Sequence, residues 1–404
     1  MRKRWIAGAL ALAVFASPLA FIKGEDVAAQ AKRIYGQDRY ETAAQISKEG
    51  WKQKTDTVIL ARGDKFPDAL AGTPLAYKEN APILLTESNK LSAKAKSEIS
   101  RLKPSKVIIL GGKNAISSSV ESELKKMNIT VERIAGDTRY ETAVKIAEKV
   151  GLDKKTAIVA DGRNYPDALA IAPYAAKQGY PILLVDKNMP KEVKGVLNKV
   201  NKTIVVGGEN AVNKNVYNQL PGASRIAGKD RYATASAIIK YEYKGDVPSA
   251  YVATGQNFAD ALTGSVLAAK NGQPVILVKK DQVPDDIMKL VTDKKTSDFT
   301  AFGGPNAISD KVLEQLQNKG QKVENENPAY DPNYPNYDQW VNHTRIAPQA
   351  WEYYKGMEQR IKNGTATAKD YYGYRFKVEE LLWTYYKGPI PASPYEQEMM
   401  NRLA

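Results

Sequence analysis

The feature that most constrains this chain is a long stretch of sequence that occurs three times. Each copy contains the same three short landmarks in the same order. Equivalent residues lie about 96 positions apart, as from Gly111 to Gly207 and from Gly207 to Gly303. A unit of that length is too long for a solenoid repeat and long enough to bury a hydrophobic core. We therefore expect the chain of 404 residues to contain three related domains and a remainder at each end.

The landmarks are specific enough to align the three copies residue by residue. The first landmark reads Arg-Ile-Tyr/Ala-Gly, then two variable residues, then Arg-Tyr-Glu/Ala-Thr-Ala, and spans 33–43, 133–143 and 225–235. The second has the pattern aromatic-Pro/Ala-Asp-Ala-Leu and spans 66–71, 165–170 and 258–263. The third begins with Gly-Gly and spans 111–116, 207–212 and 303–308.

Short apolar runs alternate with amphipathic stretches in every copy. In the first copy, the expected strands are Thr57–Ala61, Pro82–Thr86, Lys106–Leu110 and Ile129–Ile134, and the expected helices are Phe66–Ala76, Leu91–Leu102 and Ser118–Lys126. Strands that are apolar throughout and separated by helices indicate a parallel sheet covered on both faces. The predicted fold class is α/β, with three small layered α/β repeats at 31–130, 131–222 and 223–323.

The N-terminal 30 residues have the pattern of an export signal. Arg2, Lys3 and Arg4 precede an apolar run from Trp5 to Ile22, and small residues follow. This predicts a signal peptide over residues 1–30, and an uncleaved membrane anchor is the alternative. We expect the protein to be secreted and to act outside the cell or at the cell surface.

The composition changes at Glu324, where an Asn-, Pro- and Tyr-rich stretch begins. Two helical patterns follow, Pro348–Lys362 and Thr367–Lys387. Residues 324–404 are therefore predicted to form a linker and an aromatic-rich helical hairpin. Its aromatic residues either recruit a partner, with peptidoglycan or another surface protein as candidates, or fix the hairpin to the third repeat.

Charge and composition narrow the class of function. The net charge is +14, and residues 31–323 carry the excess of Lys and Arg, with +7, +4 and +3 in the successive repeats against −2 in the tail. A basic exported surface attracts polyanions, and export argues against nucleic acid as the partner. Lysines that only keep the surface soluble are the alternative.

Little in the sequence supports catalysis or a bound metal. The chain has no cysteine and one histidine, His343, so cysteine-rich and multi-histidine zinc sites are excluded. No Walker-type lysine follows the Gly-Gly landmark, so a nucleotide site is not supported. No pair of carboxylates stands out as a glycosidase would require. We expect no cofactor, no metal and no catalytic residue.

In their order and number, the landmarks resemble those of the cell wall binding repeat 2 family of Gram-positive bacteria over roughly residues 31–323. The resemblance implies three modules around a pseudo-threefold axis. It also implies non-covalent anchoring of an exported surface protein to an anionic wall polymer, such as a teichoic-acid-like chain. The alternatives are a peptidoglycan hydrolase or its amidase-associated accessory subunit, and a structural component of a surface layer or an adhesin.

Three residue types recur at fixed places and are the candidate ligand-binding residues. They are Arg39, Arg139 and Arg231; Tyr40, Tyr140 and Tyr232; and Asp68, Asp167 and Asp260. Arginine contacts phosphate or carboxylate groups well, the tyrosines could stack on sugars, and each aspartate opens a helix after a strand, where parallel sheets bind ligands.

Structural roles are the alternative for all three residue types. Each arginine precedes its aspartate by 28 or 29 residues, which suits an Arg–Asp pair that holds a repeat together, and each tyrosine could pack in the core. The Gly-Gly landmark is either a phosphate cradle or a tight turn, and we favour the turn. The third copy has Ala233 where the others have Glu41 and Glu141, so the three surfaces need not be equivalent.

Overall fold

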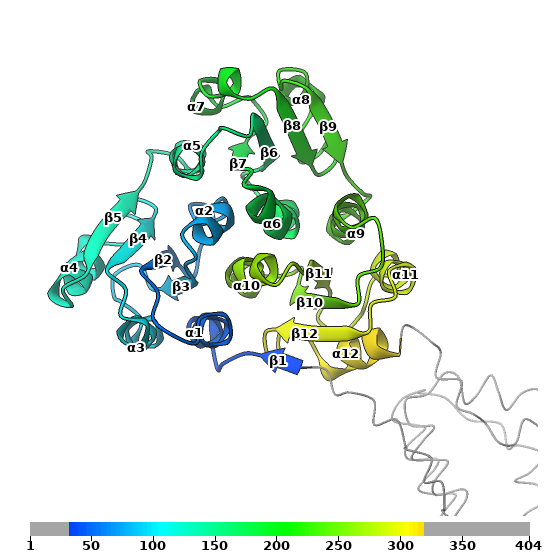
Figure 1. Ribbon diagram of the computed structural model, residues 1–404. Helices are drawn as coiled ribbons and strands as arrows, with labels where there is room; N and C mark the ends of the chain where they lie inside the picture. Colours follow the sequence, from blue (N-terminus) through cyan, green and yellow to red (C-terminus); the bar gives the residue numbers. More distant parts are fainter. Residues whose placement is uncertain (1–31, 319–404) are drawn as a thin grey trace, which may run out of the picture. The chain divides into compact units, whose positions relative to one another are not determined.

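The computed structural model describes residues 32–318. The predicted signal peptide and the predicted linker and helical hairpin lie outside the described residues. Figure 1 shows that helices and strands alternate through the three repeats, as the sequence pattern predicts.

The bounds of the elements are as follows. The first repeat contains α1 (Arg39–Gly50), β2 (Thr57–Arg62), α2 (Thr73–Lys78), β3 (Ile83–Thr86), α3 (Ala93–Leu102), β4 (Lys106–Leu110) and α4 (Ser118–Lys126). The second contains α5 (Arg139–Val150), β6 (Thr156–Asp161), α6 (Pro166–Gln178), β7 (Ile182–Val185), α7 (Lys191–Lys194), the 3-10 helix η1 (Leu197–Lys199), β8 (Lys202–Val206) and α8 (Lys214–Tyr217). The third contains α9 (Arg231–Glu242), β10 (Ser249–Thr254), α10 (Ala259–Lys270), β11 (Val275–Val278), α11 (Asp285–Asp293), β12 (Asp298–Phe302) and α12 (Asp310–Gln317).

Three further strands, β1 (Lys32–Ile34), β5 (Thr130–Ile134) and β9 (Ala223–Ile226), each precede the first helix of a repeat. Each of them pairs with the sheet of the preceding repeat. The sheets have the orders β3-β2-β4-β5, β7-β6-β8-β9 and β11-β10-β12-β1, and all pairs are parallel. The predicted α/β class with parallel sheets is therefore confirmed.

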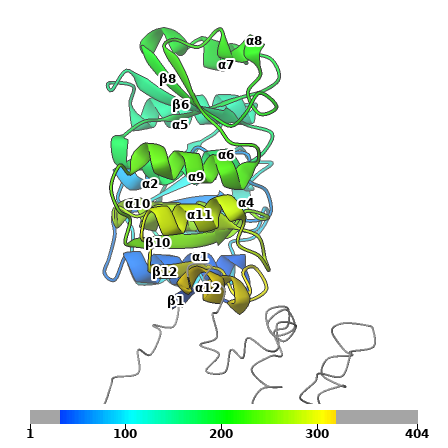
Figure 2. The same ribbon diagram turned by 90° about the vertical axis from the view of Figure 1, so that its right-hand side faces the viewer.

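The N-terminal strand closes the three repeats into a ring. Lys32 pairs with Thr300 and Ile34 pairs with Phe302, so β1 is the fourth strand of the third sheet. The Arg33 guanidinium also forms an ion pair of 2.6 Å with Asp310 on α12. Figure 1 shows β1 beside β12 at one edge of the ring, and Figure 2 shows the same pair from the side.

Helices α2, α6 and α10 occupy the centre of the ring, one from each repeat (Figure 1). Their facing surfaces are rich in alanine, and one hydrophobic cluster of buried residues continues through all three repeats. Gly264 shows how close the packing is, because a Cβ atom there would lie 2.2 Å from the Phe302 ring. Most of the core is therefore shared among the repeats, and a second, smaller hydrophobic cluster lies within the second repeat.

One helix is shorter than the sequence predicts. The pattern in the first copy indicates a helix from Phe66, but α2 begins at Thr73, and residues 67–71 form turns. The first copy combines Gly72 with Pro74, whereas the second has Ile171 with Pro173 and the third has Gly264 with Val266. Glycine and proline both oppose helix formation, so their combination delays the start of α2.

A candidate functional site between repeats

The carboxyl ends of the strands bring landmarks from neighbouring repeats together. The aspartate of the second landmark lies against the first glycine of the third landmark in the same repeat. A Cβ atom on Gly111, Gly207 or Gly303 would lie 2.8, 2.4 or 2.7 Å from the Oδ2 atom of Asp68, Asp167 or Asp260. These glycines also have φ of +104°, +95° and +112°. The turn interpretation of Gly-Gly therefore has a physical reason, because only glycine fits there.

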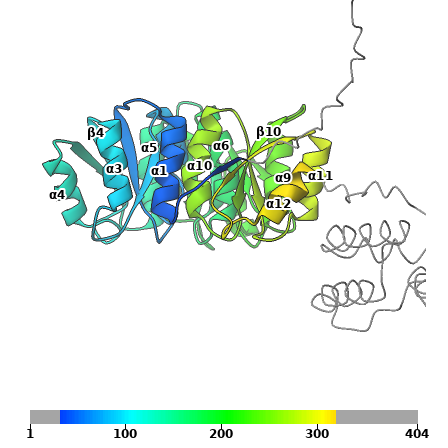
Figure 3. The ribbon, with the colours of Figure 1, turned by 90° about the horizontal axis from the view of Figure 1, so that it is seen from below.

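The first landmark of the following repeat completes each group. Its capping residue, Asp38, Thr138 or Asp230, accepts hydrogen bonds from backbone N–H groups in the first turn of α1, α5 or α9. This cap sets the arginine at the first position of the helix. Figure 3 shows helices α1, α5, α6, α9 and α10 roughly parallel to one another. Each of them follows a strand of a parallel sheet, so its N-terminal end lies near the carboxyl end of that strand.

The three arginines make the same contact within their own repeats, and two of them, Arg39 and Arg231, also reach a neighbouring repeat. The Nη1 atoms of Arg39, Arg139 and Arg231 donate to the carbonyl oxygens of Gly63, Gly162 and Gly255, at 2.6, 2.9 and 2.6 Å, within their own repeats. The guanidinium carbon of Arg39 lies 5.8 Å from the Phe258 ring centroid of the third repeat. The guanidinium of Arg231 lies 5.9 Å from the Tyr165 ring centroid of the second.

The aspartates on which the charges of Arg231 and Arg39 act belong to the preceding repeat. Burial raises the pKa of Asp167 to about 6, against the opposing effect of the Arg231 charge. Burial likewise raises the pKa of Asp260 to about 6, and the Arg39 charge lowers it in part. The hypothesis of an Arg–Asp pair within one repeat is therefore wrong in its partners. The sequence spacing could not show this, because every repeat offers an equivalent aspartate.

At the junction of the first and second repeats, a threonine hydroxyl contacts the aspartate of the preceding repeat. The Oγ1 atom of Thr142 donates to Asp68 Oδ1 at 3.0 Å. In all three copies the threonine hydroxyl also accepts a hydrogen bond of 3.1 Å from a backbone N–H group. The pairs are Thr42 with Gly36, Thr142 with Gly136 and Thr234 with Gly228. The aspartates of the second landmark thus contact the beginning of the next repeat, which gives them a role in assembling the ring.

An aromatic triad stands between these groups. The ring centroids of Phe66, Tyr165 and Phe258 lie 5.3, 5.7 and 6.1 Å apart, with the edge-to-face geometry that aromatic pairs prefer. Sequence reasoning gave these residues no role. The available signal was an aromatic residue immediately before Pro/Ala-Asp in every copy.

The tyrosines of the first landmark pack inside their repeats. The rings of Tyr40, Tyr140 and Tyr232 fill the space where Gly63, Gly162 and Gly255 have no side chain. The Tyr140 hydroxyl donates to Asp186 Oδ2 at 2.7 Å, and Tyr232 is only 7% exposed. This geometry favours packing over sugar stacking.

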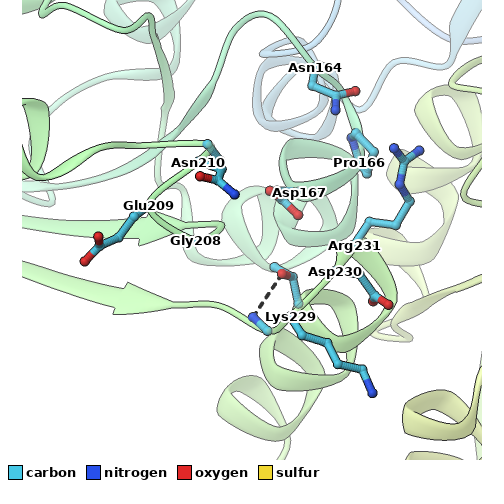
Figure 4. A pocket seen from close by; sticks show the side chains of 12 residues that line it. Asn164, Pro166, Asp167, Gly208, Glu209, Asn210, Lys229, Asp230 and Arg231 are labelled. Carbon is cyan, nitrogen blue, oxygen red and sulfur yellow. Dashed lines mark hydrogen bonds between the residues drawn. The ribbon is translucent and has the colours of Figure 1, made fainter.

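A pocket of about 270 Å³ lies where all three landmarks meet, at the junction of the second and third repeats. We call it the 2/3 pocket. Its lining residues are Asn164, Pro166, Asp167, Gly208, Glu209, Asn210, Ala211, Gly228, Lys229, Asp230, Arg231 and Thr234. Figure 4 shows Asp167 in the middle of this group, with Asn210 on one side and Arg231 on the other. The 2/3 pocket therefore contains two of the nine predicted ligand-binding residues.

The 2/3 pocket has a mixed polar lining. Its acidic side chains are Asp167, Glu209 and Asp230, and its basic side chains are Lys229 and Arg231. Figure 4 shows the side chains of Glu209 and Lys229 pointing away from Asp167. The Lys229 ammonium is 3.1 Å from Asp286 and remains largely exposed. The pocket can therefore offer amide, carboxylate and cationic groups to one ligand.

The other two junctions carry larger side chains at related positions. Ala233 corresponds to Glu41 and Glu141, whose Oε2 atoms accept from the backbone N–H groups of Gln37 and Asp137 at 3.0 and 2.7 Å. Ala227 corresponds to Ala135 in the second copy and to Tyr35 in the first. The Tyr35 ring lies against Gly304, where a Cβ atom would be 2.8 Å away. The small residues Ala227 and Ala233 leave the 2/3 junction more open than these substitutes would.

Within residues 32–318, there is no group of three or more His, Asp or Glu side chains that could hold a metal ion. No helix in that part of the chain is long and apolar enough to cross a membrane.

Comparison with known proteins gives the family. The family model of cell wall binding domain 2 (CWB2) matches three stretches, residues 33–121, 133–217 and 225–313. The chain belongs to the CWB2 family. Its three repeats are cell wall binding domains, as the order of the landmarks predicted.

Two curated relatives come from Bacillus subtilis (strain 168). The N-acetylmuramoyl-L-alanine amidase LytC is 37% identical over 310 residues, which is 76% of this chain and 61% of the relative. The amidase enhancer is 38% identical over 311 residues, which is 74% of this chain and 42% of the relative. The matches thus span between two fifths and three fifths of these relatives' lengths.

Two solved structures from Clostridium difficile have a similar arrangement. Cwp8 has a TM-score of 0.67 and 30% sequence identity, and the match covers 72% of this chain and 51% of Cwp8. Cwp6 has a TM-score of 0.65 and 28% identity, with coverage of 72% and 47%.

Proposed function

We propose that the three repeats anchor an exported protein non-covalently to an anionic polymer of the bacterial cell wall, such as a teichoic-acid-like chain, and that the 2/3 pocket is the principal contact. The observation that carries this proposal is the convergence of all three landmarks on that pocket. Ligands of α/β proteins commonly bind at the carboxyl ends of parallel strands, which is where these loops lie.

The chemistry of the pocket suits a chain of sugars or polyols with negative groups. Asn164, Asn210 and Asp167 can exchange hydrogen bonds with hydroxyl groups, while Lys229 and Arg231 can contact anions. The net charge of +14 on residues 31–323 adds a long-range attraction to any polyanion. Recognition at short range therefore comes from the pocket residues. Attraction at long range comes from the net charge of all three repeats, to which Lys229 and Arg231 also contribute.

The nine residues chosen from the sequence take different roles in this proposal. Arg231 and Asp167 line the pocket and are proposed to contact the polymer. The remaining two arginines and two aspartates, together with the three tyrosines, are proposed to contribute by holding the loops of the ring in place, through the contacts described above.

The test is retention on purified wall sacculi, with the substitution Ala233→Glu. This change copies the glutamate of the first two repeats, so the fold should accept it. The new carboxylate would accept a hydrogen bond from the backbone N–H group of Lys229, as Glu41 and Glu141 accept one from the backbone of Gln37 and Asp137. It would also place a negative charge at the pocket. We expect affinity for sacculi to fall about fivefold or more, as unfavourable charge contacts at an interface do.

Glu141→Ala is the matched control, because it makes the opposite exchange at the junction of repeats one and two. We expect it to leave retention undiminished. Equal retention of Ala233→Glu and the unchanged chain would show that the 2/3 pocket is not the principal contact. Retention that did not weaken with added salt, or after chemical removal of the anionic polymer, would contradict the anionic ligand.

The names of the two Bacillus relatives favour a second candidate function, an accessory or catalytic role in amidase action on peptidoglycan. Zymography of the whole chain, alone and mixed with an amidase of the same wall, tests it. A clearing band from the chain alone, or a stronger amidase band in the mixture, would support this second function, and unchanged clearing would rule it out.

A further inference from the structure

A second pocket lies at the opposite end of the central helices, away from the landmark loops. Its volume is about 290 Å³, and it is lined by Trp51, Tyr77, Asn80, Val266 and Lys270. These residues belong to the C-terminal parts of α1, α2 and α10 or to the residues that follow them. Figure 1 shows α10 beside both α1 and α2, so the pocket is built by the third and first repeats together.

A lysine at the end of each central helix holds neighbouring repeats together here. Lys78 donates to the carbonyl oxygens of Lys149 and Val150 at 2.8 and 3.1 Å. Lys177 lies 5.9 Å from the Tyr243 ring centroid, and Lys270 lies 4.8 Å from the Trp51 ring centroid. The lysine alone is therefore a general part of the ring and does not distinguish this pocket.

Two residues of the first copy do distinguish it. Tyr77 occupies the position of Ala176 and Ala269, and Asn80 occupies the position of Gly179 and Gly272. The Tyr77 ring is 36% exposed, and only Tyr35 is another large hydrophobic side chain exposed to this degree within residues 32–318. The Asn80 side chain accepts a hydrogen bond of 3.1 Å from Lys270 Nζ. The ring thus presents an aromatic face, an amide and an ammonium at one place.

We propose that this pocket binds a single acidic sugar unit, a pyranose ring that carries a carboxylate. An exposed aromatic ring offers a surface for the apolar face of a sugar, and an amide pairs with hydroxyl groups. The volume is near the lower end of the roughly 300–1,000 Å³ of small-molecule pockets, which suits one sugar unit better than an oligomer.

The ammonium of Lys270 gives the preference for a carboxylate. Its neighbours remove water from it and lower its pKa. The Trp51 ring and the side-chain oxygen Oδ1 of Asn80 face the Lys270 ammonium. Among the described residues, no carboxylate pairs with this ammonium. A ligand carboxylate would supply the missing counter-charge. The inference rests on the proposed function in taking the wall glycan as the source of the acidic sugar.

The experiment is saturation-transfer NMR on the full chain, with glucuronate as the probe and glucose as the neutral comparison. We expect transfer to the ring protons of glucuronate and much weaker transfer to glucose. Tyr77→Ala and Asn80→Gly reproduce residues that the other two copies already have, so both variants should fold. We expect Tyr77→Ala to weaken glucuronate binding about fivefold, as expected for loss of an aromatic contact.

Tyr35→Ala is the matched control, since it removes the other exposed tyrosine, and it should leave the glucuronate signal unchanged. An unchanged signal in Tyr77→Ala, or equal transfer to glucose and glucuronate, would overturn the inference. Retention on sacculi separates the two proposals. A chain that is retained on sacculi but shows no transfer to glucuronate refutes the acidic-sugar site alone. Loss of retention in both Ala233→Glu and Glu141→Ala concerns the 2/3 pocket and leaves the glucuronate result unaffected.

Discussion

The buried aspartates of the ring lead to a prediction about pH. Burial raises the pKa of Asp260 from the ordinary 3.8 to about 6. Between these two values, the folded protein binds more protons than the unfolded chain, so stability falls as pH rises. The contribution of Asp260 is complete below pH 3.8 and is lost as pH passes through about 6. The substitution Asp260→Asn removes the titrating group while keeping its shape.

The size of the effect follows from the two pKa values. With 1.36 kcal/mol for each pKa unit, the Asp260 carboxyl stabilises the folded state at pH 4 by about 2 kcal/mol relative to pH 7. Asp260→Asn lacks this dependence. We therefore expect the stability difference between Asp260→Asn and the unchanged chain to shift by about 2 kcal/mol between these pH values, in favour of the variant at pH 7.

Urea unfolding followed by circular dichroism at both pH values measures this double difference. All other titrating groups are common to the two proteins and cancel. Asp246→Asn, at an exposed carboxylate that pairs with Lys295, is the control for the loss of a surface charge, and the shift of Asp260→Asn should exceed whatever shift it produces. If Asp260→Asn lost the same stability at both pH values, folding would not shift the pKa of Asp260 and our reasoning about burial would fail. A shift of the opposite sign, with the larger loss at pH 7, would show that the carboxylate is held as a favourable ion pair with Arg39.

Two further predictions concern the fit of the landmark loops. Gly207→Ala should destabilise the protein by more than ~1 kcal/mol, because φ is +95° and the new Cβ would lie 2.4 Å from Asp167 Oδ2. Gly208→Ala is the control and should be nearly neutral in the same urea assay, because its new Cβ would have no atom within 4 Å. Phe258→Ala should cost about 3–5 kcal/mol, because the ring is only 7% exposed and contacts both other members of the triad. Tyr35→Ala, at a ring that is 48% exposed, should cost much less, and equal losses would contradict the central position of the triad.

The strands and the fold class could be predicted because their signal is local. Lys106–Leu110 is continuously apolar after its first residue, and the structure has β4 with those bounds. Repeated alternation of such runs with helices is enough to indicate parallel sheets. The late start of α2 could not be predicted from the Phe66–Ala76 stretch, because its pattern is helical throughout. Comparison with the other two copies shows that only the first combines Gly72 with Pro74, which together delay the start of the helix.

The partners within the site could not be predicted, because a repeated sequence does not say which copy an interaction joins. The spacing of 29 residues from Arg39 to Asp68 suggested a pair, but Arg39 acts on Asp260, 221 positions away. The same ambiguity concealed the pairing of β1 with β12. In a closed ring every residue has an equivalent partner in two other repeats, and only the three-dimensional arrangement selects one.

The residues that the copies share and those in which they differ have separate roles. The shared arginines, aspartates, landmark glycines and central aromatics contact one another and build the ring. The divergent positions lie at or next to the pockets. Lys229 lines the 2/3 pocket and Ala233 lies against Gly228 in its wall, while Tyr77 and Asn80 line the second pocket. Because a shared framework holds each loop in the same place, a single exchange there alters a pocket without disturbing the fold. Triplication therefore supplies the scaffold, and we infer that ligand specificity arises where the three copies disagree.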